Sequence, residues 1–203
     1  MNYALLVTEF VTLFVIIDPI GLTPLFAALT QGMDAAQRRA IAIRACLIAA
    51  LLLALFTFLG EAVLGFVGIS MPAFRIAGGI LLFLTALEML FEKRTKRRED
   101  QADERPDPSV FPLAIPLIAG PGSIATVILL AGEHSAMMGR LGTLLVTLGV
   151  LAIMLVMFMG AGLLQRALGK TGINVVTRLL GMLLAALSVQ FVLDGLRAFG
   201  FSG

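Results

Sequence analysis

Two short segments of this 203-residue chain combine prolines and glycines with groups that could bind a ligand. One runs from Asp18 to Pro24 (DPIGLTP) and the other from Gly120 to Ser123 (GPGS). A proline removes a backbone donor and clashes with the preceding turn, so neither segment can continue a helix. Each break frees backbone N–H groups that could bind a carboxylate, and Asp18 could bind an ammonium group or a proton.

The elements that carry these segments have the composition of a membrane protein. The chain is 59% hydrophobic and 14% charged, with a mean hydropathy of +1.01, whereas a soluble domain carries about 25% charged residues. A span needs about 20 apolar residues, and no basic residue precedes Phe10, so the first apolar segment does not resemble a cleavable signal peptide. We therefore expect an all-α polytopic protein with six transmembrane helices, at 3–30, 40–60, 72–91, 109–132, 141–164 and 174–197.

The charges divide the chain and indicate its orientation. Residues 92–107 hold six basic and six acidic side chains. We expect a single transmembrane domain over 1–203, made of a first three-helix repeat (1–91), a charged loop (92–108) and a second three-helix repeat (109–203). Ten lysines and arginines follow spans one, three and five, against two on the opposite side, which predicts a cytoplasmic charged loop and both termini outside.

Several classes of function are disfavoured by what the chain lacks. One cysteine and one histidine cannot form a disulfide or a Cys/His zinc cluster. The basic run is interleaved with acids, so it does not predict nucleic-acid binding. No nucleophile with a base accompanies Asp18 in the predicted spans. We expect neither an enzyme nor a bound cofactor or metal.

The two sides of the charged loop match each other at a shift of about 102 residues. Asp18–Pro24 aligns with Gly120–Thr126, and Arg75-x-x-Gly78 aligns with Arg178-x-x-Gly181. Three helices per half is an odd number, so the second half must enter the membrane from the opposite side. This predicts a 3+3 inverted-topology repeat with the first and fourth helices broken at mid-membrane, an arrangement found in secondary transporters.

The two breaks predict a binding site for a zwitterion. We expect a half-helix to follow each break, capped by Thr23 before Pro24 in one case and by Gly122 or Ser123 in the other. Backbone N–H groups would bind a carboxylate, and Asp18 would handle an ammonium group or a proton. Small α-amino acids fit this pattern. The alternative is that Asp18 only caps its own helix and the breaks are packing kinks.

The predicted residues fall into three groups. Those expected to bind the substrate are Asp18, Gly21, Thr23, Gly120, Gly122 and Ser123, and those that break or hinge the helices are Pro19, Pro24, Pro116 and Pro121. Supporting roles are assigned to Arg75, Arg178, Thr85 and Ser188. The arginines either hold the broken loops or extend to the membrane surface, and the hydroxyls either line the cavity or bond to backbone.

Three further expectations concern the rest of the spans. Gly78, Gly79 and Gly181 would allow close helix packing. Glu9 would pair with Arg75 on the outer side, and His134 would be solvated in an outer loop.

The two motifs together resemble those of the MarC family of integral membrane proteins, which includes the SnatA-type neutral amino-acid transporters. The resemblance rests on Asp18 to Phe26 (DPIGLTPLF) and Ala119 to Thr126 (AGPGSIAT) and extends over the whole chain. It implies a bacterial inner-membrane or archaeal cell-membrane protein and, for the SnatA branch, transport of small neutral amino acids such as glycine and alanine, coupled to an ion such as H⁺ or Na⁺. The alternatives are a non-transporting structural or regulatory membrane protein and an exporter of another small solute.

Overall fold

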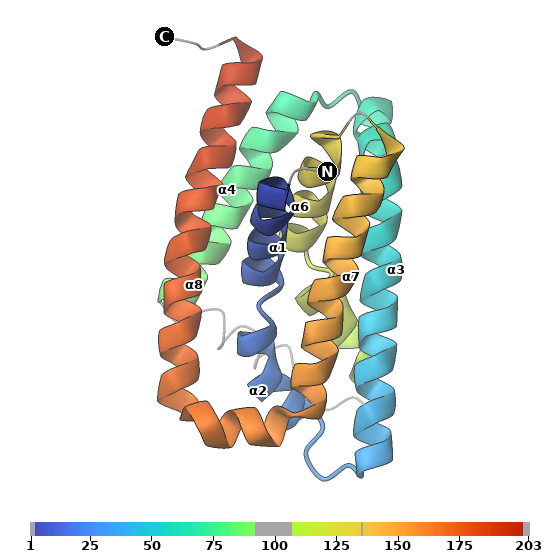
Figure 1. Ribbon diagram of the computed structural model, residues 1–203, viewed down its shortest axis with the longest axis vertical. Helices are drawn as coiled ribbons and strands as arrows, with labels where there is room; N and C mark the ends of the chain where they lie inside the picture. Colours follow the sequence, from blue (N-terminus) through green and yellow to red (C-terminus); the bar gives the residue numbers. More distant parts are fainter. Residues whose placement is uncertain (1–2, 92–106, 135, 201–203) are drawn as a thin grey trace.

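The computed structural model describes residues 3–91, 107–134 and 136–200, so most of the predicted charged loop lies outside the described residues. Within these ranges every regular element is helical (Figure 1), which confirms the all-α prediction. The elements are α1 (Tyr3–Ile17), α2 (Pro19–Leu29), α3 (Ala35–Val67), α4 (Met71–Leu90), η1 (Ser109–Ile118), α6 (Pro121–Gly132), α7 (Met137–Met159) and α8 (Ala161–Phe199).

The helices are long and apolar enough for a multi-pass membrane protein. Five segments qualify as spans by length and hydropathy: Leu5–Leu29, Ala35–Val67, Met71–Leu90, Met137–Met159 and Thr171–Phe199. A sixth candidate joins η1 to α6 across a bend of 52°. The positions agree with the six predicted spans to within several residues.

The helical segment that directly follows α7 was not predicted. The fifth span was expected to reach residue 164, but α7 stops at Met159, and the first part of α8 runs across the end of the molecule before the helix turns at Gly169 (Figure 1). Gly169 has φ 61° and ψ 177°, a conformation that only glycine adopts readily. Leu163 and Arg166 are exposed on the crosswise part, as in helices that lie in a membrane interface.

The segments that carry the two breaks lie inside the bundle. α1 and α2 run through the middle of the molecule (Figure 1), with Leu13, Ile17 and Leu22 fully buried. α2 packs against α7 and α8, whereas α6 packs against α3 and α4. α1 packs against α7, and η1 packs against α3. The central segments therefore depend on the surrounding long helices for their position.

The most extensive helix pair is α4 with α8, and glycines bring the two backbones together. A Cβ built on Gly79 would lie 2.8 Å from the carbonyl oxygen of Ser188, and one on Gly181 would lie 3.3 Å from that of Ala86. Gly195 meets the carbonyl of Pro72 in the same way. These contacts confirm the predicted close packing at Gly79 and Gly181, and they show that α4 and α8 are antiparallel.

We expect Gly79→Ala to destabilise the protein by about 1–3 kcal/mol, because its methyl group would overlap the backbone of α8. The matched control is Gly149→Ala in α7, where an added Cβ meets nothing within 4 Å. That change should be neutral or stabilising by up to about 1 kcal/mol. Thermal unfolding in detergent would compare the two variants, and equal stabilities would contradict the packing argument.

Candidate functional site

Asp18 separates α1 from α2 and is fully buried. It has a left-handed backbone (φ 57°, ψ 61°), and its Oδ1 accepts a hydrogen bond of 3.0 Å from the N–H of Gly21. It therefore caps α2, as the packing-kink alternative proposed. The predicted cap at Thr23 was wrong: Thr23 lies inside α2, and its hydroxyl donates to the carbonyl of Pro19 at 2.7 Å. Pro19 occupies the first helical position, so α2 begins earlier in the chain than predicted.

Gly21 is required by the conformation of Asp18. A Cβ at position 21 would overlap Oδ2 of the Asp18 carboxylate. A side chain there would displace the carboxylate or the cap, so the two residues form one structural unit.

The second break follows two prolines in η1. Phe111 and Ile115 have extended backbones, φ near −127° and ψ near 126°, because each precedes a proline, Pro112 or Pro116. The predicted kink at Pro116 is present, and Pro112 adds a second one that sequence reasoning missed although the same signal marks it. The carbonyl of Pro116 approaches Gly120 so closely that a Cβ there would overlap it.

α6 begins earlier than predicted. Gly120 is its N-cap (φ −88°, ψ 173°) and Pro121 its first residue, so the predicted caps at Gly122 and Ser123 were wrong. The Ser123 hydroxyl lies 2.6 Å from the carbonyl oxygen of Ile118, and 3.0 Å from that of Gly120, which also accepts from the N–H of Ile124. No side chain caps α6. Its first turn therefore presents N–H groups and the positive end of the helix dipole.

The two breaks are neighbours. A Cβ built on Gly122 would lie 3.6 Å from Ile16, two residues before Asp18, and 4.0 Å from the hydroxyl of Thr85 on α4. Ser123 is only 3% exposed, whereas Pro121 is exposed and Gly21 and Gly122 are half-exposed. The accessible surface thus reaches the start of both helices beside a buried carboxylate.

The four residues predicted to have supporting roles bond to backbone carbonyls, pair with a carboxylate or lie exposed on a helix. Thr85 donates to the carbonyl of Leu81 at 3.0 Å, and Ser188 donates to that of Ala185 at 2.6 Å, as the backbone-bonding alternative predicted. Arg75 pairs with Glu133 at 3.4 Å, and Arg178 is exposed on α8.

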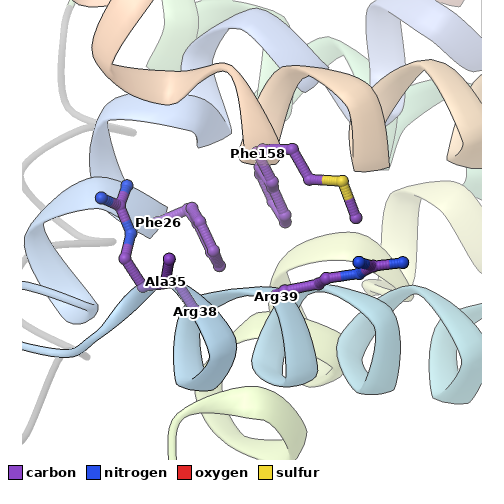
Figure 2. A pocket seen from close by; sticks show the side chains of 6 residues that line it. Phe26, Ala35, Arg38, Arg39 and Phe158 are labelled. Atoms are coloured by element: carbon purple, nitrogen blue, oxygen red, sulfur yellow. The ribbon is translucent and has the colours of Figure 1, made fainter.

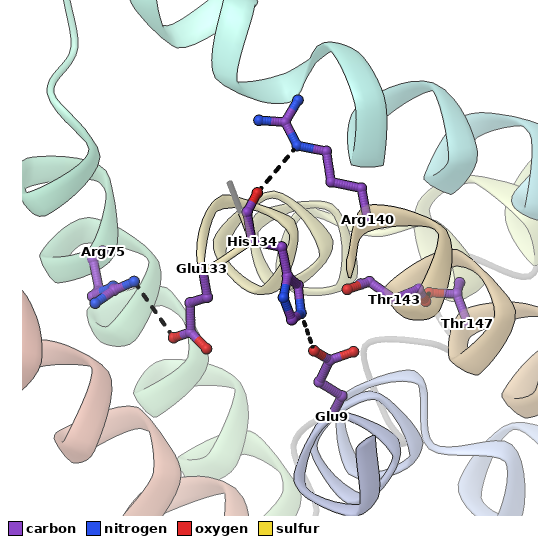
Figure 3. Close-up of polar contacts among 7 residues, drawn as sticks. All are labelled: Glu9, Arg75, Glu133, His134, Arg140, Thr143 and Thr147. Carbon is purple, nitrogen blue, oxygen red and sulfur yellow. Dashed lines mark hydrogen bonds and ion pairs between the residues drawn. The ribbon is translucent and has the colours of Figure 1, made fainter. Parts of the chain in front are cut away.

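A charged cluster lies at the end of the molecule where α1 begins and α6 ends (Figure 3). We call it the Glu9 end. The carboxylate of Glu9 contacts Nε2 of His134 at 2.7 Å, and Arg140 pairs with Glu61. The predicted Glu9–Arg75 pair was therefore wrong, because the chain after α6 reaches α1 and Arg75 takes Glu133 instead. His134 is not freely solvated, since its side chain is only 18% exposed.

Burial and the nearby arginine have opposite effects on the pKa of the carboxyl group of Glu133, which follows α6. Burial raises the pKa of its carboxyl group above the ordinary value, and the guanidinium of Arg75 opposes that rise. Nearby Glu9 raises the pKa further.

A cavity of about 250 Å³ lies at the opposite end, which we call the Phe26 end (Figure 2). The rings of Phe26 on α2 and Phe158 on α7 stack with centroids 4.4 Å apart, and the guanidinium of Arg38 lies 6.0 Å from the Phe26 centroid. Sequence reasoning missed this contact, because no local pattern relates Phe26 to Phe158. The cavity is lined by Phe26, Ala35, Arg38, Arg39, Phe158 and Met159.

Metal binding has no support in the part of the chain that the structure describes. No group of three or more histidine, cysteine, aspartate or glutamate side chains could hold an ion there.

Comparisons with known proteins give one family. The family model described as "MarC family integral membrane protein" matches residues 3–199. UPF0056 membrane protein YvbG of Bacillus subtilis (strain 168) is 36% identical over 203 residues, covering 97% of this chain and 96% of the relative. UPF0056 inner membrane protein YhgN of Escherichia coli (strain K12) is 37% identical over 199 residues, covering 95% and 96%. No solved structure matches the chain.

The cap at Asp18 gives a stability prediction. Asp18→Ala removes the acceptor for Gly21, a loss of about 1 kcal/mol, and forces alanine into a left-handed conformation at a further cost of about 1–2 kcal/mol. Asp18→Asn keeps an acceptor and tolerates this conformation, so it should unfold close to wild type. Thermal unfolding of both variants in detergent tests this, and an alanine variant as stable as the asparagine variant would refute the cap.

Proposed function

The chain belongs to the MarC family of integral membrane proteins, and we propose that it is a secondary transporter of small neutral amino acids, such as glycine and alanine, that works by alternating access. It is a multi-pass membrane protein, and one relative is named an inner membrane protein. We place it in the plasma membrane with both termini outside, which puts the Glu9 end outside and the Phe26 end in the cytoplasm.

The pattern of helix contacts supports a 3+3 inverted repeat. Under the predicted shift, α2 corresponds to α6, α3 to α7 and α4 to α8. α2 packs against α7 and α8 of the second half, and α6 packs against α3 and α4 of the first half. α1 on α7 is likewise matched by η1 on α3. Such an exchange of partners is what a two-fold relation between the halves produces, and the antiparallel α4–α8 pair fits the same axis.

The observation that carries the substrate assignment is a buried carboxylate beside an uncapped helix start. The N–H of Gly21 already donates to Asp18, so the helix start in the first half is occupied by a carboxylate of the protein itself. α6 has no side-chain cap, and its first turn at Gly122 and Ser123 would bind the carboxylate of an amino acid. Asp18 would then receive the ammonium group.

The surroundings of this position favour a small, uncharged side chain. Gly122 faces Ile16 and Leu82 at 3.6 Å and 3.5 Å from a built Cβ. These apolar neighbours offer no counter-charge for a basic or acidic side chain. Glycine and alanine have the size and polarity that such walls accept.

Alternating access needs contacts that close each end in turn. At the Glu9 end, Glu9 of the first half contacts His134 of the second. At the Phe26 end, Phe26 of the first half stacks on Phe158 of the second. In this proposal, rocking of the halves about the α4–α8 pair separates one of these contacts while the other stays closed.

The direct test is uptake of radiolabelled glycine and alanine into proteoliposomes, with and without a proton or sodium gradient. We expect saturable uptake by wild type, and a loss of about tenfold or more in Asp18→Asn, which removes a charged hydrogen bond to the substrate. The matched control is Asp34→Asn, another helix cap exchanged for an amide, at the exposed start of α3. It should transport as wild type does.

The outcome separates the classes of function. Flux that does not saturate would indicate a channel. No flux under any gradient would contradict the proposal and favour a structural or regulatory membrane protein, or an exporter of another solute. Unchanged uptake in Asp18→Asn would remove Asp18 from the mechanism.

A further inference from the structure

We propose that Glu9 and His134 form a proton-binding site at the Glu9 end of the molecule, and that this proton drives transport. The proposal rests on the proposed function and adds the coupling ion and its residues.

The carboxylate of Glu9 has the features of a functional group rather than a surface charge. Glu9 lies in the apolar segment Leu5–Leu29 and its side chain is 0% exposed. Its Oε1 contacts Nε2 of His134 at 2.7 Å, and its Oε2 is buried with no hydrogen-bond partner among the described residues. A buried, half-satisfied acid in a membrane helix is costly, and such residues commonly serve ion or proton pathways.

The neighbouring carboxylates differ from Glu9 in their partners. Glu133 pairs with Arg75 from α4, and Glu61 of α3 pairs with Arg140 from α7. Arginine stays charged at all physiological pH values, whereas histidine changes its charge near neutrality. Among the described residues, the contact of Glu9 is therefore the only carboxylate–cation contact between different elements in which the cation can become neutral.

Other polar and charged groups surround the Glu9–His134 pair. Arg140 Nε donates to the carbonyl of His134 at 3.5 Å. Thr143 on α7 lies in the same cluster (Figure 3), and its hydroxyl is buried without a partner in the described structure. From α8, the charge of Asp194 acts on Glu133. These neighbours do not replace the cation that Glu9 needs.

The proton can be placed on one atom. In the proposed site Glu9 is ionised and accepts from Nε2–H of the neutral imidazole, so the added proton binds at Nδ1. The pair changes from a net charge of −1 to zero, with no other bond broken. Nδ1 faces Gly139 at the start of α7, where a built Cβ would lie 2.6 Å away. Glycine at this position therefore leaves room for the ring.

The pair connects the two elements that form the candidate substrate site. Glu9 lies on α1, which ends at the Asp18 break, and His134 follows α6, which begins at the Gly120 break. These elements also meet beside the breaks, at Ile16 and Gly122. Adding a proton to the Glu9–His134 pair brings its net charge to zero and strengthens the contact between α1 and the end of α6. Loss of that proton weakens the contact. Proton binding is thereby linked to closure over the site.

The experiment compares two modes of transport in proteoliposomes. Exchange of external radiolabelled alanine for internal unlabelled alanine needs no net proton movement, whereas accumulation driven by a pH gradient does. We expect Glu9→Gln and His134→Gln each to keep exchange and to lose gradient-driven accumulation. Glu61→Gln, which removes a carboxylate from the same end, should keep both. A pH-sensitive dye inside the vesicles should report alanine-dependent proton movement in wild type and in Glu61→Gln only.

The outcomes distinguish the two proposals. A wild type with neither exchange nor accumulation overturns the proposed function. A wild type that accumulates alanine on a sodium gradient alone overturns only the proton site. The proton site is also wrong if both variants accumulate alanine on a pH gradient. If a variant elutes as a folded protein yet loses exchange as well, its role is structural. Should Glu9→Gln fail to fold, His134→Gln, which keeps a side-chain donor, decides the matter alone.

Discussion

Lipid offers no partners to backbone N–H and C=O groups, so a chain that breaks its helices inside a membrane must satisfy those groups from its own side chains. In the proposed topology, the helix interruptions at Asp18 and at Ala119–Gly120 follow that constraint. Asp18 accepts from Gly21, and the Ser123 hydroxyl reaches two carbonyl oxygens of the second break. The residues predicted to bind substrate thus first stabilise the irregular backbone. In the proposed mechanism a ligand would act on groups that already hold the structure together.

The interruptions at Asp18 and at Ala119–Gly120 could be predicted from sequence because their cause is local, and their mid-membrane depth stays a prediction. Proline disfavours helix at the residue before it, which places the interruptions before Pro19 and Pro121, although Pro24 lies inside α2. The apolar runs along the chain indicated the six expected spans. The caps were placed wrongly at Thr23 and at Gly122 or Ser123. The rule that proline favours the first helical position was applied to Pro24 rather than Pro19, and was not applied to Pro121. The same rule, read from the first proline of each motif, would have given Asp18 and Gly120.

The contacts between the halves could not be predicted, since they depend on how distant segments pack. Glu9 was predicted to pair with Arg75 on the outer side, but its partner His134 lies in the chain after α6. Phe26 and Phe158 carried no signal at all. By contrast, the glycines of α4 and α8 were predicted to pack closely because small residues in apolar helices have few other uses.

The crosswise first part of α8 has a mechanical consequence. Its exposed Leu163 lies near the end of α7, and Gly169 joins it to a span of 29 residues, Thr171–Phe199. A span of that length, at about 1.5 Å per residue, exceeds a hydrocarbon core of about 30 Å. Such a helix crosses the core either by tilting or by extending its polar ends, which carry Arg178 and Arg197, beyond it. The tilt of α8 is then set by the helix it packs on, and the close contacts at Gly79, Gly181 and Gly195 make that helix α4.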